Sequence, residues 1–329
     1  MKKIYWFAPV LAIALSCSEE TPLTDRSAEF RMVEPAQRSC ASHEVLLEQI
    51  RQDPERGRRL DEIEAFTQSV ISNPKLMRTL ADGTIEIDVI VNVLYNKPAE
   101  NISDAQIASQ IAVLNEDFSG TNRDYNKTST YNSVKAGNTK ISFKLKQIIR
   151  KQTTVTSWST NDNMKRSSNG GLDPIDPTKA LNMWSCNLSN GILGYAQFPG
   201  GASSTDGVVI LYSAFGSKDK TQGTFTTTYD LGRTATHEVG HWLNLRHIWG
   251  DSRCGNDFVA DTPQHDAANY NCPPAGTLSR CKGQPVEMTM NYMDYTADAC
   301  MYMFSNEQKA RMQAVLAAGG PRNLIATTP

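Results

Sequence analysis

The chain has 329 residues, of which 40% are hydrophobic and 21% charged, and its formal net charge is −2. This composition is typical of a globular protein with enough chain for a large core, in one or two domains. The balanced charge gives no reason to expect a nucleic-acid or membrane-surface partner.

The first 17 residues are typical of an export signal. Two lysines precede an apolar run at 4–16 that is too short to span a bilayer. Ala14-Leu15-Ser16-Cys17 resembles a bacterial lipobox, in which Cys17 would carry the lipid. An ordinary secretory signal is the alternative. Both predict export from a bacterial cell, either secreted or lipid-anchored at the outer membrane or cell surface.

Residues 18–60 are predicted to form a tether and a propeptide ahead of a catalytic domain at 61–329. The segment 43–72 has helical spacing and many charges. Within it, Glu55-Arg56-Gly57-Arg58-Arg59 looks exposed and suited to proteolysis. Cys40 precedes this basic cluster and is the only cysteine between Cys17 and Cys186.

The region from 84 to 212 has the pattern of a sheet with one helix. Apolar, β-branched or alternating segments predict strands at 84–95, 140–146, from 181, at 192–196 and at 207–212. Ser103 and Gln106 form a capping box for a helix that runs to about Phe118. The polar stretch 150–180 is predicted to be a loop.

The strongest motif is His237-Glu238-Val239-Gly240-His241, followed by His247. Two histidines four residues apart share a helix face and can bind one Zn²⁺. His247 cannot be reached along the same helix, so the chain must turn back, and Asn244 is suited to that turn. Three histidines leave one zinc position open for water, as in catalytic sites, and Glu238 can take the proton of that water.

The alternative to a zinc site is a core helix with chance histidines. Three of the five histidines of the chain fall in this window, with a glutamate at the right offset. That clustering argues against chance.

After His247 the chain loses regular periodicity until about residue 305 and contains four cysteines: Cys254, Cys272, Cys281 and Cys300. In an exported protein they predict two disulfides, with three pairings open. A second zinc site is the alternative, although no CxxC pair is present. Cys186 is then a buried free thiol. A last helix begins at Ser305, with Gln308 as its capping-box partner, and stops at Gly319.

The histidine motif, together with Met293-Asp294-Tyr295, closely resembles the pappalysin branch of the metzincins, the ulilysin-like group, over about residues 80–318. Asn244 stands where the family usually has glycine, a change that leaves the ligands intact. The resemblance implies an α+β fold with an upper mixed twisted sheet and two helices. It also implies an irregular lower subdomain that ends in a helix.

The resemblance also implies roles for residues outside the histidine motif. Met293 would pack beneath the three histidines as the Met-turn, and Tyr295 would stabilise the oxyanion. Met290 and Tyr292 have the same spacing, so a shifted frame is the alternative. The implied disulfides are Cys254–Cys281 and Cys272–Cys300.

Three further sites are expected on the same basis. Calcium is expected at Asp257, Asp261 and Thr262, with a solvated turn as the alternative. The Cys40 thiolate is expected to occupy the open zinc position of a latent proenzyme, as in ulilysin-like proenzymes, and a merely unpaired thiol is the alternative. Asp298 is expected at the base of the pocket just after the cut bond, where it would select Arg or Lys. The strand at 192–196 is expected to pair with the substrate backbone.

The sequence therefore predicts a secreted or lipid-anchored zinc endopeptidase made as a latent proenzyme. Its expected partners are protein or peptide substrates and its own propeptide, with no nucleic acid and with a membrane only through the lipid anchor. The alternatives are a catalytically silent surface binding protein on a metzincin scaffold and a zinc amidase. Glu238 disfavours the first of these, because a silent scaffold need not keep the base.

Overall fold

A computed structural model of the chain describes residues 1–3, 37–73, 75–76, 83–127 and 129–325. The predicted export signal from residue 4 onward, including Cys17, and the tether up to residue 36 lie outside the described residues. Within the described part of the chain, no helix is long and apolar enough to cross a membrane.

Five strands form one mixed sheet in the order β2-β1-β3-β5-β4. The strands are β1 (Ile85–Tyr95), β2 (Ile141–Gln152), β3 (Ala180–Cys186), β4 (Gly194–Ala196) and β5 (Val208–Leu211). The pairs β1–β2, β1–β3 and β3–β5 are parallel, and only β4 is antiparallel to its neighbour. The short β4 therefore forms one edge of the sheet, as predicted.

The second strand is longer than predicted. It extends through Gln152, whereas the polar stretch from residue 150 was expected to be loop. The cause is its neighbour, because β1 continues to Tyr95 and pairs there with Gln152. Pairing with an adjacent strand thus overrides the weak local preference of three polar residues.

Strand β1, which has a neighbour on each side, supplies much of the core. Ile87, Val89, Val91 and Val93 are fully buried, and so are the neighbours Ile90 and Leu94 on the other face. A strand covered on both faces is typical of parallel sheets. Each fully buried Val or Ile contributes about 1.5–3 kcal/mol relative to an exposed one.

Two helices accompany the sheet, which gives the predicted α+β fold. Helix α4 (Asp104–Ser119) contacts β2, and its first turn is capped by the Ser103 hydroxyl, which accepts the N–H of Gln106. Helix α5 (Arg233–Trp242) contacts β4, β5 and α4, and all of its residues are buried. The sheet edge β4 and helix α5 are thereby held side by side.

Residues between Ile248 and Phe304 contain no long regular element, as predicted. Two disulfides, Cys254–Cys281 and Cys272–Cys300, tie this segment together in the pairing that the resemblance implied. Cys186 is a buried free thiol. Helix α6 (Asn306–Leu316) follows, with Ser305 and Gln308 forming its capping box.

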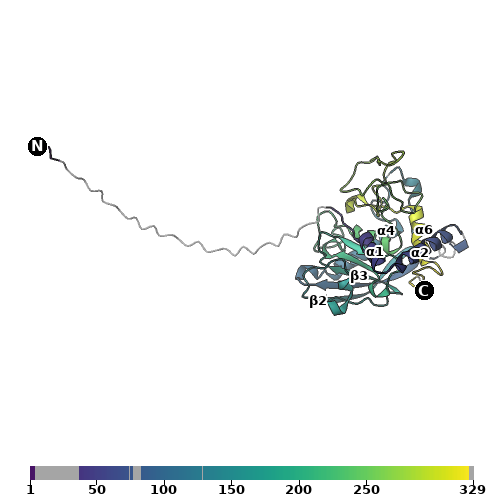
Figure 1. Ribbon diagram of the computed structural model, residues 1–329, viewed down its shortest axis with the longest axis horizontal. Helices are drawn as coiled ribbons and strands as arrows, with labels where there is room; N and C mark the ends of the chain where they lie inside the picture. Colours follow the sequence, from purple (N-terminus) through teal and green to yellow (C-terminus); the bar gives the residue numbers. More distant parts are fainter. Residues whose placement is uncertain (4–36, 74, 77–82, 128, 326–329) are drawn as a thin grey trace. The chain divides into compact units, whose positions relative to one another are not determined.

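Two helices precede the sheet: α1 (Ser42–Gln52) and α2 (Glu55–Ile71). Helix α2 lies against α6, where Val70 packs on Ala314 and Ala317 (Figure 1). The domain boundary expected at residue 60 therefore falls inside α2.

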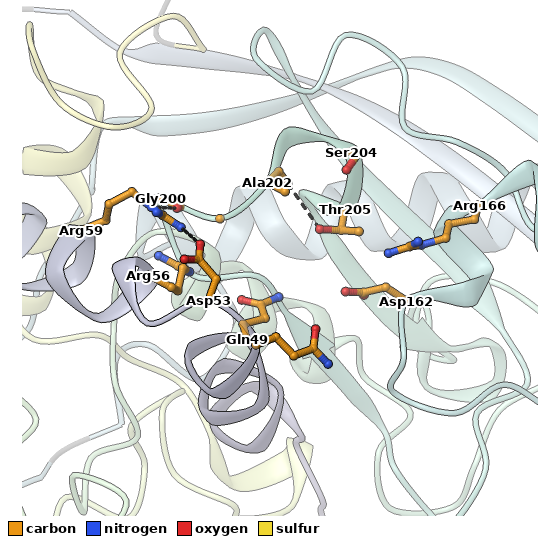
Figure 2. A pocket seen from close by; sticks show the side chains of 12 residues that line it. Gln49, Asp53, Arg56, Arg59, Asp162, Arg166, Gly200, Ala202, Ser204 and Thr205 are labelled. Atoms are coloured by element: carbon orange, nitrogen blue, oxygen red, sulfur yellow. Dashed lines mark hydrogen bonds and ion pairs between the residues drawn. The ribbon is translucent and has the colours of Figure 1, made fainter.

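The expectation that the basic cluster Arg56–Arg59 is exposed is wrong for Arg56. Its guanidinium is buried and donates to the carbonyls of Phe198 and Pro199, at 2.8 and 2.7 Å. Arg59 donates to the carbonyl of Gly200 at 3.1 Å, beside a cavity of about 510 Å³ that contains none of the motif histidines (Figure 2). In helix α2 the side chains of Arg56 and Arg59 face the loop after β4. Of the three arginines in the cluster, only Arg58 is exposed.

Candidate metal centre

Three imidazoles meet at the C-terminal part of α5. His237 and His241 lie one turn apart on that helix, and the chain reverses after it at Asn244, whose φ of 73° is left-handed. This turn brings His247 back, so that Nε2 of His241 lies 3.1 Å from Nε2 of His237 and 3.1 Å from Nε2 of His247. All three side chains are buried.

Each imidazole is oriented by a partner at its other nitrogen. Nδ1 of His237 lies 2.7 Å from the carbonyl of Tyr292, and Nδ1 of His241 lies 2.8 Å from the carbonyl of Leu245. Nδ1 of His247 contacts the carboxylate of Asp251. Because these partners are acceptors, they favour a hydrogen on Nδ1 of each ring, which leaves Nε2 free to bind a metal ion.

This donor set fits a metal ion. Burial, with the neighbouring histidines as a second cause, lowers the pKa of His237 and His241 well below the usual range, so both rings are neutral. Lone pairs that face each other at 3.1 Å repel unless a cation lies between them. Three neutral imidazoles are a donor set of catalytic zinc sites.

Cys40 is brought to the same point. Its Sγ and one ring nitrogen of each motif histidine all lie within 4.8 Å of one another, the only such group found among the described residues. Backbone pairing fixes the segment, since Ala41 N–H donates to the Gly194 carbonyl and Leu193 N–H donates to the Ser39 carbonyl. Edge strand β4 thus binds the N-terminal segment itself.

Glu238 lies next to the histidines and is buried. Its carboxylate accepts the Ser42 hydroxyl at 2.9 Å and the Cys40 thiol at 3.3 Å. Burial raises the pKa of Glu238 to about 7, although these two donors lower it. A Cβ on Gly194 would come within 3.0 Å of this carboxylate, so only glycine leaves it room on β4.

Met293 and Tyr295 both face the centre. A Cβ on Gly240 of α5 would lie 2.5 Å from the Met293 sulfur, so Met293 packs directly under the helix. The Tyr295 ring lies 5.0 Å from that of His247, and its hydroxyl donates to the Cys40 carbonyl at 3.0 Å. Met290, from the alternative frame, packs instead with the cluster around Ile248.

Asp298 is buried, and its carboxylate binds Arg38. The guanidinium of Arg38 reaches one Asp298 oxygen at 2.5 Å, the Thr234 hydroxyl at 3.2 Å and the Thr296 carbonyl at 3.3 Å. It also stands 4.9 Å from the centre of the Tyr229 ring. The other Asp298 oxygen accepts the N–H groups of Leu231 and Arg233 at the start of α5, which fixes the carboxylate in place.

The residues expected to bind calcium serve as caps in this structure. Asp257 accepts the Val259 N–H and the Thr262 hydroxyl, and Asp261 accepts the Ser305 hydroxyl and the Glu307 N–H. Burial raises the pKa of Asp257 to about 6. No group of three acidic, histidine or cysteine ligands gathers there among the described residues.

Sequence reasoning missed three residues at the centre: Arg38, Ser42 and Asp251. Arg38 and Ser42 flank Cys40 at two residues on either side, and that symmetry was a usable signal. Asp251 follows His247 by four residues, close enough to orient it. Sequence motifs alone do not show which carboxylate folds back onto a histidine.

Comparisons with known proteins agree with this geometry. Residues 168–317 match the family described as pregnancy-associated plasma protein-A. An extracellular metalloprotease of Colletotrichum graminicola is 33% identical over 287 residues, which cover 83% of this chain and 87% of that protein. Extracellular metalloprotease 1 of Coccidioides posadasii is 31% identical over 70% of this chain and 76% of its own length.

Two solved structures are also similar to the chain. Mature mirolysin of Tannerella forsythia with a cleaved peptide is 45% identical, with a TM-score of 0.70, over 74% of this chain and 96% of that one. A promirolysin mutant from the same organism is 42% identical, with a TM-score of 0.78, over 88% of this chain and 97% of that one. The precursor structure thus matches more of the chain than the mature one does.

Replacing Asp251 with Asn should weaken metal binding, because His247 loses the carboxylate that orients it. The expected loss of zinc affinity is about 10–100-fold, measured by competition with a chromophoric chelator. Asp266→Asn is the matched control, since Asp266 borders the same side of the centre without contacting a histidine ring. Equal zinc affinities for the parent and Asp251→Asn would contradict this role.

Proposed function

Because the chain belongs to the pappalysin family of metalloproteases, we propose that it is a zinc endopeptidase made as a latent proenzyme, with His237, His241 and His247 as the zinc ligands. The observation that carries this proposal is the convergence of three Nε2 atoms beside a buried glutamate. Zinc bound there would polarise the peptide carbonyl and lower the pKa of the attacking water.

Glu238 is the general base of the proposed reaction. It neighbours a ligand in sequence, yet its carboxylate faces Ser42 and Cys40 rather than the ring nitrogens. A carboxylate in this place can take a proton from water and return it to the leaving amine.

Tyr295 is the proposed oxyanion donor. Its phenol donates to the backbone carbonyl of Cys40, the residue seated at the three histidines. A substrate carbonyl at the same place would receive the same hydrogen bond, which strengthens as negative charge develops on its oxygen. Met293 supports the site from below as the packing platform under α5.

Latency is proposed to come from residues 38–42. Cys40 Sγ would be the fourth ligand of a bound zinc ion, Ser42 binds the carboxylate of Glu238, and Arg38 binds Asp298. All three contacts must be broken before a substrate can enter. We place the propeptide at 18–60 and the catalytic domain at 61–329, so a cut at Arg56–Arg59 requires the first turns of α2 to unwind.

The Asp298 pocket is proposed to select Arg, or Lys, just after the cut bond. Arg38 supports this assignment, because its guanidinium is held there by a carboxylate, a hydroxyl, a carbonyl and an aromatic face. A basic substrate side chain could make the same contacts once Arg38 has left.

The proposed location is outside a bacterial cell, either free or lipid-anchored through Cys17. Extracellular relatives support secretion. A structural calcium ion is also proposed near Asp257, Asp261 and Thr262. Its support is the buried Asp257 carboxylate, which has no Lys or Arg ion pair in the described part of the chain and which a cation would stabilise.

Glu238→Ala should retain zinc but lose about 10²–10⁴-fold in casein-cleavage rate, because only the proton acceptor is removed. His247→Ala is the contrasting variant and should lose zinc after dialysis. Metal analysis and casein hydrolysis, with and without a chelator, measure both. Cleavage at the parent rate by Glu238→Ala would refute the mechanism. A parent protein that binds zinc but does not cleave casein would point to the amidase or binding-protein alternatives.

Asp298→Asn should reduce cleavage before Arg or Lys by about 10–100-fold, because one charge-assisted hydrogen bond is lost. Asp230→Asn is the control, since Asp230 pairs with Lys218 and does not touch Arg38. A peptide library reports the preference. Unchanged enrichment of Arg and Lys in Asp298→Asn would place the specificity elsewhere.

Removing calcium at saturating zinc should lower the melting temperature, because an ion bound only to the folded state stabilises it by mass action. The Asp257→Asn variant should lose this dependence. The comparison uses the Glu238→Ala protein so that self-digestion does not interfere. A melting temperature that ignores millimolar changes in free calcium would disprove the site.

A further inference from the structure

A second group of buried polar side chains lies behind the metal centre. Asp294, Glu287 and His265 are 0%, 5% and 0% exposed, and the side-chain amide of Asn269 lies among them. None of these residues contacts the three motif histidines in the described hydrogen bonds. The mechanism above uses none of them, although Asp294 directly precedes Tyr295.

Asn269 holds the Asp294 carboxylate with both its backbone and its side chain. Its N–H donates to Oδ1 at 2.8 Å, and its amide nitrogen donates to Oδ2 at 3.0 Å. The N–H of Tyr295 donates to the same Oδ1 at 2.8 Å. One carboxylate therefore connects the backbone of Tyr295 to Asn269, which lies 25 residues earlier in the chain.

The amide of Asn269 is itself held in place. It also donates to Glu287 at 2.6 Å, and the other Glu287 oxygen accepts the Asp266 N–H at 3.3 Å. Further along, Asn271 accepts the Ala297 N–H at 2.7 Å, and Cys272 is joined to Cys300. Residues 265–272 are thus linked to residues 294–300 at three places: Asn269 to Asp294, Asn271 to Ala297, and Cys272 to Cys300.

Burying the Asp294 carboxylate lowers the stability of the fold, and a role in positioning Tyr295 would explain why it is kept there. Among the ion pairs of the described residues, Asp294 has none with Lys or Arg, and only His265 approaches it, at 3.6 Å. A buried carboxylate held by neutral donors is less stable than an apolar residue of the same size. What the carboxylate provides instead is a directional link at the peptide unit of Tyr295.

Tyr295 needs that link because its ring is held by few other polar contacts. Among the described residues its hydroxyl bonds to Cys40 alone, a contact that disappears once residues 38–42 leave the centre. The ring otherwise packs by its faces and edges on other aromatic rings, namely those of His237, His247, Trp249 and Tyr270. Backbone placement then decides where the phenol oxygen lies, and an error of 1 Å at such a position can cost 10²-fold in rate.

We propose that Asn269 is a positioning residue for Tyr295, which acts through the Asp294 carboxylate to fix the phenol at the metal centre of the mature enzyme. This inference rests on the oxyanion role proposed above for Tyr295. It assigns a role in catalysis to residues 265–272, which contain none of the proposed zinc ligands and not the proposed general base.

The test is a double-mutant cycle on the mature enzyme, with kcat and KM measured on a peptide and zinc content measured on each variant. Tyr295→Phe should lower kcat by about 10²–10³-fold. Asn269→Ala should lower kcat at least tenfold, with KM within twofold of the parent and full zinc content. The double variant should match Tyr295→Phe alone, because a positioning residue has no effect once the group it positions is gone.

Two further variants make the result decisive. Asp294→Asn keeps the size of the side chain but presents an amide to the amide of Asn269, so it should reproduce the kcat loss even if Asn269→Ala folds poorly. Asn271→Asp is the control, since Asn271 contacts the Met-turn segment through its carbonyl and Asp tolerates its left-handed φ of 57°. Its kcat should equal that of the parent.

Three outcomes overturn the proposal. If Asn269→Ala and Asp294→Asn keep the parent kcat while Tyr295→Phe loses it, Tyr295 acts but is positioned by other contacts. If the losses multiply in the double variant, Asn269 acts on the fold in general. If Tyr295→Phe keeps the parent kcat, the oxyanion role is wrong and the positioning inference falls with it.

Discussion

The convergence of three imidazoles on one point is the constraint from which the rest of the structure follows. It requires a helix that ends one residue after His241 and a chain that reverses at a left-handed Asn244. It requires glycine at 240, so that the Met293 sulfur can approach α5. It also requires acceptors at each Nδ1, which Tyr292, Leu245 and Asp251 provide. Helix α5, the turn after it and the irregular segment each contribute to these supports.

The N-terminal segment contacts each group to which a role in catalysis or specificity is proposed above. Within five residues, Arg38 binds Asp298, Cys40 lies at the histidines, and Ser42 binds Glu238. The three histidines and Glu238 therefore lie together while this segment is bound. Helix α2 adds a second attachment away from the metal, through Arg56 and through the pairing of Glu64 with Arg311.

Elements with a strong local signal could be predicted from the sequence. The alternating or β-branched segments became β1 and β2, and the capping residues Ser103 and Ser305 begin α4 and α6. The convergence of the three histidines could be predicted because helix geometry and one turn determine it. Contacts across long sequence separations could not be predicted in this way. Arg38 and Asp298 lie 260 residues apart, and periodicity showed α2 to be helical but not that Arg56 would be buried against the loop after β4.

The central claim is that the Cys40 thiolate and the three histidines share one metal ion in the latent protein. Cobalt substitution of the Glu238→Ala proenzyme tests it most directly, because thiolate bonded to Co²⁺ absorbs in the near ultraviolet by charge transfer. The account predicts this band in the Glu238→Ala protein, its loss when Cys40→Ala is added, and its persistence when the buried Cys186 is replaced instead. A proenzyme without the band, or a band that survives Cys40→Ala, would contradict the account.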